Sequence, residues 1–160
     1  MRASIFIILF SVLISAQTTP KLDFRGNRPG HATVAATPTA LAVKPGAKIA
    51  LFIDVTPNPK IHVYAPGAKD YIPITVKLDP QAAIKPGKLS YPKSETMTFV
   101  DEKVPVFQKP FRLTQEATIA DSAQAGTTLT LTGKVDYQAC DDVVCFPPES
   151  ANVAWTIAVK

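Results

Sequence analysis

The sequence predicts an all-β protein built as an antiparallel β-sandwich, and three observations support this. Hydrophobic residues recur with a period of two in several segments, Pro and Gly residues separate these segments, and no stretch shows the periodicity of an amphipathic helix. Fifteen prolines among 160 residues agree with many turns and short elements. With 46% hydrophobic and 19% charged residues, the composition excludes a disordered or collagen-like chain.

Strands are predicted in order from the alternation of apolar and polar residues. The alternation is clearest in four segments, residues 48–55, 72–78, 128–137 and 153–159. It is weaker in five others, residues 33–43, 61–64, 84–89, 104–107 and 111–119. Trp155 falls on the apolar face of its segment and is expected in the core. One-sided burial is typical of antiparallel sheets, and this number of short strands is typical of an immunoglobulin-like sandwich.

The connections between these strands carry two kinds of signal. Pro-Gly dipeptides at residues 45–46, 66–67 and 86–87 predict three tight turns. Residues 91–110 lack clear alternation and mix charged with aromatic residues, so we expect a long irregular loop there. Long loops in compact domains often have a functional role.

The N-terminus has the pattern of a secretory signal peptide. Met1-Arg2 is followed by an apolar stretch up to Ile14 and by small residues that end at Ala16. We therefore expect residues 1–16 to be removed by cleavage near Ala16. Residues 17–40 are expected to form a poorly defined extension, and residues 41–160 a single domain. The mature protein is then expected to be periplasmic or secreted, where a disulfide can persist.

The charge distribution restricts the class of partner. Seventeen Lys and Arg residues against thirteen Asp and Glu residues give a net charge of +4, and no two basic residues are adjacent. This scatter lacks the basic patch of a nucleic-acid-binding surface, so no nucleic-acid partner is predicted. We expect a monomer.

The two cysteines, Cys140 and Cys145, are separated by four residues, which suits a hairpin-like loop in which the sulfurs meet. A six-residue ring constrains the unfolded chain by only about 2 kcal/mol, against about 5 kcal/mol for a ring of about 100 residues. Such a bridge stabilises the fold only weakly. The spacing is compatible both with an inert disulfide and with an exchangeable one. Continuing the alternation of residues 128–137 puts Ala139 inward and Cys140 on the opposite, accessible face.

Neighbouring residues distinguish the two sulfurs. Asp141 and Asp142 follow Cys140 and disfavour a thiolate there, whereas Val144 and Phe146 flank Cys145. Cys145 is therefore the better attacking or attacked sulfur, and Cys140 the resolving partner.

The segment around the cysteines resembles a known family. Tyr137-Gln138-Ala139-Cys140 is followed by Cys145-Phe146-Pro147-Pro148-Glu149. This is similar to the Tyr-Gln-x-Cys and Cys-x-Pro-Pro-Glu segments of the N-terminal periplasmic domain of DsbD, an immunoglobulin-like domain with a redox cysteine pair. Weaker similarity extends over residues 48–160.

The resemblance implies a protein-disulfide reductase component that works without a cofactor. Its electrons would come from a membrane donor related to the DsbD/CcdA transmembrane domain. They would pass through the Cys140–Cys145 pair to exported disulfide-containing or thioredoxin-like proteins, with Cys145 forming the mixed disulfides. The resemblance also places near-site residues at His62, Tyr64, Tyr137 and Pro147, and lid residues at Phe99, Asp101 and Glu102.

Two other functions remain open at this point. A non-enzymatic immunoglobulin-like binding module would use the disulfide only to fix a loop. A soft-metal carrier would hold Cu(I) with Cys140, Cys145, His62 and Met97, but their spacing matches no metal motif, so no metal site is predicted. His31 stands in a polar stretch and is expected at the surface.

Overall fold

The computed structural model describes residues 30–38, 42–99 and 101–160. These residues form strands and no helix, which confirms the predicted all-β class. The strands are β1 (Ala32–Pro38), β2 (Ala42–Val43), β3 (Lys48–Pro57), β4 (His62–Tyr64), β5 (Thr75–Leu78), β6 (Ile84–Ser90), β7 (Glu95–Phe99), β8 (Glu102–Phe107), β9 (Phe111–Ile119), β10 (Thr128–Tyr137), β11 (Ala139–Cys140) and β12 (Glu149–Val159). Within the described ranges, no helix is long and apolar enough to span a bilayer.

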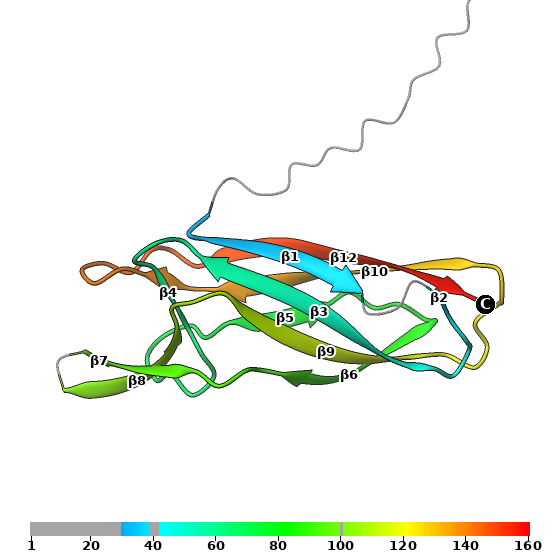
Figure 1. Ribbon diagram of the computed structural model, residues 1–160, viewed down its shortest axis with the longest axis horizontal. Coiled ribbons are helices and arrows are strands. Elements are labelled where there is room, and N and C mark those ends of the chain that lie inside the picture. Colours follow the sequence, from blue (N-terminus) through cyan, green and yellow to red (C-terminus); the bar gives the residue numbers. More distant parts are fainter. Residues whose placement is uncertain (1–29, 39–41, 100) are drawn as a thin grey trace, which may run out of the picture.

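Two four-stranded sheets form the layers of a sandwich, as Figure 1 shows. Their strand orders are β1-β3-β9-β6 and β2-β12-β10-β5. Neighbouring strands are antiparallel except β2 and β12, which run parallel. A third small sheet, β11-β4-β8-β7, lies at one end of the molecule, where the β7–β8 hairpin projects (Figure 1).

Alternating burial builds the core between the layers. In β10, Leu131, Val135 and Tyr137 are buried while the Thr and Lys residues between them are exposed. In β12, Trp155 is almost completely buried, and its indole nitrogen donates a hydrogen bond of 3.3 Å to the carbonyl of Phe52 in the facing sheet. The period-two pattern therefore predicted the inward faces of these strands correctly.

Three local predictions were wrong. Residues 86–87 lie inside β6, at a register shift against β9, and form no turn. Residues 91–110 are not a long loop, because β7 and β8 pair there as a hairpin. Ile72, expected on a buried strand face, is 45% exposed and precedes β5. The pairing of β6 with β9 and of β7 with β8 decides the first two conformations, and the local alternation does not report either pairing.

The N-terminal segment contributes to the sandwich. β1 pairs with β3 along its whole length, from Ala32 opposite Pro57 to Pro38 opposite Leu51. The predicted signal peptide, residues 1–16, and its cleavage site lie outside the described residues.

Candidate redox site

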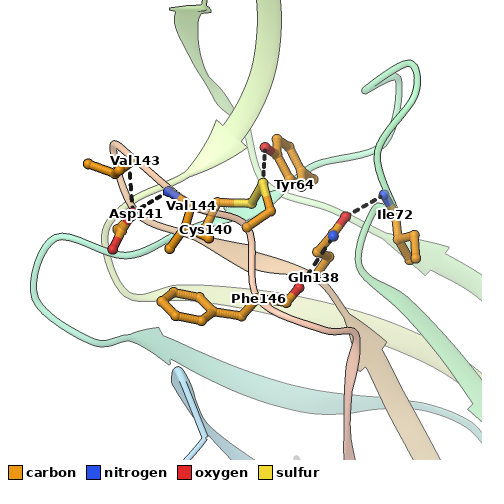
Figure 2. Close-up of a disulfide and its surroundings, with 9 residues drawn as sticks. Tyr64, Ile72, Gln138, Cys140, Asp141, Val143, Val144 and Phe146 are labelled. Atoms are coloured by element: carbon orange, nitrogen blue, oxygen red, sulfur yellow. Dashed lines mark hydrogen bonds between the residues drawn. A yellow bond between two sulfur atoms is a disulfide. The ribbon is translucent and has the colours of Figure 1, made fainter.

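The cysteines lie in a short loop that connects the second sheet to the third. After β10 ends at Tyr137, β11 leaves that sheet and pairs with β4, with Cys140 opposite His62. The chain then turns back, and the amide of Phe146 donates to the carbonyl of Ala139 at 2.9 Å. The loop returns the chain to β12 (Figure 2).

Asp141 and Gln138 hold this loop together. A carboxylate oxygen of Asp141 accepts hydrogen bonds from the amides of Val143 and Val144 at 2.8 and 2.7 Å. These bonds lower the pKa of Asp141, so it is ionised at neutral pH. The Gln138 side chain donates to the Phe146 carbonyl at 3.3 Å and accepts from the Ile72 amide at 3.3 Å. The loop is therefore closed by side chains of its own sequence.

Cys140 and Cys145 form a disulfide, so the two side chains meet as their spacing allows. Cys145 is exposed, and Cys140 is only 1% exposed. The expectation that Cys140 lies on an accessible face is wrong, because β11 has moved into the third sheet. There Cys140 packs in a small cluster with Tyr64, Val104 and Val106.

Tyr64 lies beside the exposed sulfur. Its hydroxyl oxygen is 3.4 Å from Cys145 Sγ, and because that sulfur carries no proton in the disulfide, the hydroxyl is the donor (Figure 2). The Tyr64 ring stacks on Tyr71 with a centroid distance of 4.1 Å. Burial, with a smaller contribution from Tyr71, raises the pKa of Tyr64 to about 12. The phenol therefore stays protonated under all conditions in which thiols exchange.

His62 is paired with Cys140 in the β4–β11 ladder. The residue is buried, and its Nε2 has no hydrogen-bond partner among the described residues. Its ring is within 5.4 Å of the Tyr64 ring and 5.3 Å of the Phe99 ring, measured between centroids. Burial lowers the pKa of His62, and the negative charges of Asp142 and Asp141 oppose this only in part. A hollow of about 230 Å³ borders His62, lined also by Lys60, Ile61, Met97, Gln108 and Asp142.

The lid residues expected from the resemblance occupy the end of the β7–β8 hairpin. Phe99 lines a hollow of about 110 Å³ together with both cysteines, Tyr64 and Tyr71. Asp101 and Glu102 are exposed at the turn of the hairpin, where Asp101 has a φ of 71°. The charge of Glu102 contributes to the raised pKa of Tyr64. The hairpin thus brings an aromatic ring to the hollow around the disulfide, and its two carboxylates are exposed at the hairpin turn.

The other two near-site residues lie farther from the sulfurs. Tyr137 is buried in the main core, and its hydroxyl donates to Glu149 Oε2 at 2.6 Å. Pro147 is exposed in the segment that leads to β12. Neither residue lines the hollow around the disulfide.

The sequence did not reveal the position of His31. Instead of lying free at the surface, it is partly buried, with its ring stacked on Phe146 at a centroid distance of 3.6 Å. Its side chain also pairs with Glu149, which lies 118 positions further along the sequence. No local pattern signals a contact over that distance.

No group of three or more His, Cys, Asp or Glu side chains in the described ranges is arranged to hold a metal ion. His62 and Met97 line one hollow, but both cysteines are engaged in the disulfide.

Comparison with known proteins places this geometry in a family. The model of the family described as "Thiol:disulfide interchange protein DsbD, N-terminal" matches residues 31–156. The chain belongs to the DsbD N-terminal domain family. This confirms the resemblance seen in the sequence and connects the Cys140–Cys145 disulfide with a family named for thiol–disulfide interchange.

Solved structures of low sequence identity are also similar to this chain, and the ScsB domain described first shares its fold. The N-terminal periplasmic domain of ScsB from Proteus mirabilis is 15% identical, with a TM-score of 0.54, over 84% of this chain and 48% of that one. The reduced DsbD N-terminal domain of Neisseria meningitidis is 18% identical, with a TM-score of 0.48, over 78% and 83% of the two chains. The complex of the DsbD and PilB N-terminal domains from the same organism gives 16% identity and a TM-score of 0.45, over 64% and 71%. A comparison with curated proteins gives no match.

Proposed function

We propose that this chain is an exported thiol–disulfide exchange protein that passes two electrons at a time through Cys140 and Cys145 to other exported proteins. The observation that carries the proposal is the unequal exposure of a bonded pair in this family: Cys145 is exposed and Cys140 is buried. An incoming sulfur can reach only the exposed side of such a bond, so the pair has an attacking and a resolving member.

The reaction follows from that division of roles. In the dithiol form, the Cys145 thiolate attacks a client disulfide, which forms a mixed disulfide and releases one client thiolate. The Cys140 thiolate then attacks Cys145 Sγ, which restores the Cys140–Cys145 disulfide and releases the second client thiolate. The client gains two electrons, and its two thiolates take up two protons.

Neighbouring side chains support the two sulfurs in different ways. The protonated Tyr64 hydroxyl donates to the sulfur of Cys145 and can stabilise a thiolate there. His62, kept neutral by the lowered pKa that burial causes, lies opposite Cys140 in the β4–β11 ladder. In this proposal His62 accepts a proton from Cys140 before that residue resolves the mixed disulfide.

The β7–β8 hairpin acts as the lid of this site. Phe99 shares the hollow around the disulfide with Cys145, so it restricts approach to the sulfur. Asp101 and Glu102, exposed at the hairpin turn, oppose thiolate formation as long as the hairpin is closed. A partner that displaces the hairpin gains wider access to Cys145 than the closed hairpin allows.

Electrons for the next cycle come from a membrane donor related to the DsbD/CcdA transmembrane domain, and the clients are disulfide-containing or thioredoxin-like exported proteins. Export rests on the signal-peptide pattern of residues 1–16. We place the N-terminal boundary of the domain near residue 31, where the family match begins and just before β1 joins the first sheet.

Trapping of mixed disulfides tests the proposal. Cys140→Ala lacks the resolving thiol and should accumulate mixed disulfides with exported proteins through Cys145, whereas Cys145→Ala should accumulate few. Non-reducing gels of the two variants, expressed with their signal peptide, give the readout. Equal trapping would refute the division of roles. No trapping by either would favour a binding module with a structural disulfide, and tight uptake of one Cu(I) by the reduced protein would favour a soft-metal carrier.

A further inference from the structure

The start of the described chain is joined to the redox loop by one aromatic contact. His31 immediately precedes β1, and its ring lies almost parallel to that of Phe146, with an interplanar angle of 16° and a centroid distance of 3.6 Å. Phe146 directly follows Cys145 in the sequence. In Figure 2 its ring lies on the side of the loop away from Tyr64. The residue after the exposed cysteine therefore contacts a residue that precedes β1, a strand that belongs to neither arm of the redox loop.

Glu149 fixes the orientation of the His31 ring. Its Oε1 pairs with His31 Nδ1, and its Oε2 accepts hydrogen bonds from the His31 amide at 3.0 Å and from the Tyr137 hydroxyl at 2.6 Å. Tyr137 ends β10 and Glu149 begins β12, so the carboxylate is anchored in two paired strands. A side chain at Gly30 would collide with Glu149, which shows how closely the N-terminal segment approaches this carboxylate.

The restraints on Cys145 differ between the two redox states. In the disulfide form the S–S bond itself fixes the sulfur of Cys145 beside Cys140. Once that bond opens, the remaining restraints on Cys145 are the hydrogen bonds of the loop, the Tyr64 hydroxyl at its sulfur and the packing of Phe146 on His31. In one loop bond the Asp141 amide donates to the Val144 carbonyl at 3.0 Å, and in another the Phe146 amide donates to the Ala139 carbonyl at 2.9 Å. The stacking contact therefore has its main effect in the dithiol form.

We infer that His31 is a positioning residue of the redox pair: its ring, held by Glu149, fixes Phe146 and keeps Cys145 opposite Cys140 after the disulfide opens. The inference rests on the proposed exchange function. A preorganised pair closes more readily, because less conformational freedom is lost when the S–S bond forms. His31 thus makes the dithiol more reducing and speeds resolution of the mixed disulfide.

The equilibrium of the purified protein with glutathione tests this inference. The dithiol transfers two electrons and two protons to glutathione disulfide, which yields the protein disulfide and two glutathione thiols. Contact between two aromatic rings changes an equilibrium constant by roughly threefold to tenfold. His31→Ala should therefore lower the equilibrium constant for oxidation of the dithiol by glutathione disulfide by about that factor. Tenfold corresponds to a potential about 30 mV less negative. The melting temperature of the oxidised variants serves as the folding control.

Two substitutions separate the ring from the hydrogen bond. His31→Phe keeps an aromatic ring on Phe146 and should retain most of the wild-type equilibrium constant. His31→Gln keeps a donor for Glu149 but has no ring, and it should behave like His31→Ala. The matched control is Thr33→Ala, because Thr33 is exposed and lies two residues along the same segment. Its equilibrium constant with glutathione should equal that of the wild type.

A double-substitution cycle completes the test. If His31 acts through Phe146, the His31→Ala/Phe146→Ala protein should shift no further than Phe146→Ala alone. The inference would be overturned if His31→Ala had the wild-type equilibrium constant, or if His31→Gln restored that constant. It would also be overturned if the shifts of His31→Ala and Phe146→Ala added up in the double variant. The glutathione equilibrium needs no client, so it reports on His31 even if Cys140→Ala traps nothing and the proposed function fails.

Discussion

Replacement of Tyr64 by Phe tests whether its hydroxyl activates the exposed sulfur. The hydroxyl lies 3.4 Å from Cys145 Sγ, and the raised pKa of about 12 keeps it a donor. When the disulfide opens, a Cys145 thiolate is a stronger acceptor than the disulfide sulfur was. Phe retains the ring and its stacking on Tyr71, so the substitution removes only the hydrogen bond.

The expected magnitude follows from the strength of that bond. A hydrogen bond to a charged group contributes about 1.5–3 kcal/mol, and the lower end applies because the separation from the sulfur is long. Loss of about 1.5 kcal/mol reduces the thiolate population roughly tenfold at a pH where the thiol form dominates. A less stabilised thiolate is more nucleophilic, and this raises the alkylation rate of each thiolate by a factor of about three. Alkylation of Cys145 should therefore be about three to four times slower in Tyr64→Phe.

The assay measures alkylation of reduced protein by iodoacetamide at pH 7. A Cys140→Ala background leaves Cys145 as the single reacting thiol. Tyr91→Phe is the matched control, since that hydroxyl donates to the Ile74 carbonyl at 3.2 Å and does not contact the disulfide. An unchanged or faster rate in Tyr64→Phe would show that the hydroxyl does not stabilise the thiolate.

Three further predictions concern the lid, the acid response and the close approach of β10 and β5 within one sheet. Phe99→Ala should alkylate faster at Cys145 than the wild type, whereas Thr98→Ala, exposed on the same hairpin, should not; equal rates would remove Phe99 from the lid. Burial raises the pKa of Glu149, but hydrogen bonds from Tyr137 and His31 outweigh it and leave that pKa below its usual 4.5. Its contribution to stability should therefore be present above pH 4.5 and be lost as the pH falls through the lowered value, so Glu149→Gln should show a smaller drop in melting temperature on acidification; an identical drop would contradict this. Gly133→Ala should lower the free energy of unfolding in urea by about 1–3 kcal/mol, because a Cβ there would lie 2.6 Å from the Lys77 carbonyl oxygen of β5; an unaltered midpoint would argue against this packing.

Two strands were predicted to the residue, one from a weaker alternation and one from a clear alternation. The ranges 111–119 and 128–137 coincide with β9 and β10. Alternation is a local property that one buried face imposes, so the sequence contains it directly. Strand β7 escaped prediction because it is short and its two apolar residues, Met97 and Phe99, are only partly buried.

The site was predictable only where its residues are adjacent in sequence. The cysteines stand in one short motif, and their reactivity was argued from immediate neighbours. The burial of Cys140 depends on β11 leaving the second sheet to pair with β4, which alternation along β10 does not reveal. The stacking of His31 on Phe146 depends on the pairing of β1 with β3 and on the position of Glu149 in β12. Contacts of this kind follow from topology alone.

The reduction potential of the Cys140–Cys145 pair tests the central claim most directly. The potential can be measured by equilibrating the purified protein in thiol buffers of known ratio and quantifying the free thiols. Structural disulfides of secreted proteins have potentials below about −300 mV, and exchange disulfides lie above that value. An exchange protein requires a potential above about −300 mV, with full recovery of the disulfide after a cycle of reduction and oxidation. A value well below −300 mV would show that the bridge only fixes the loop, and it would contradict the proposed function.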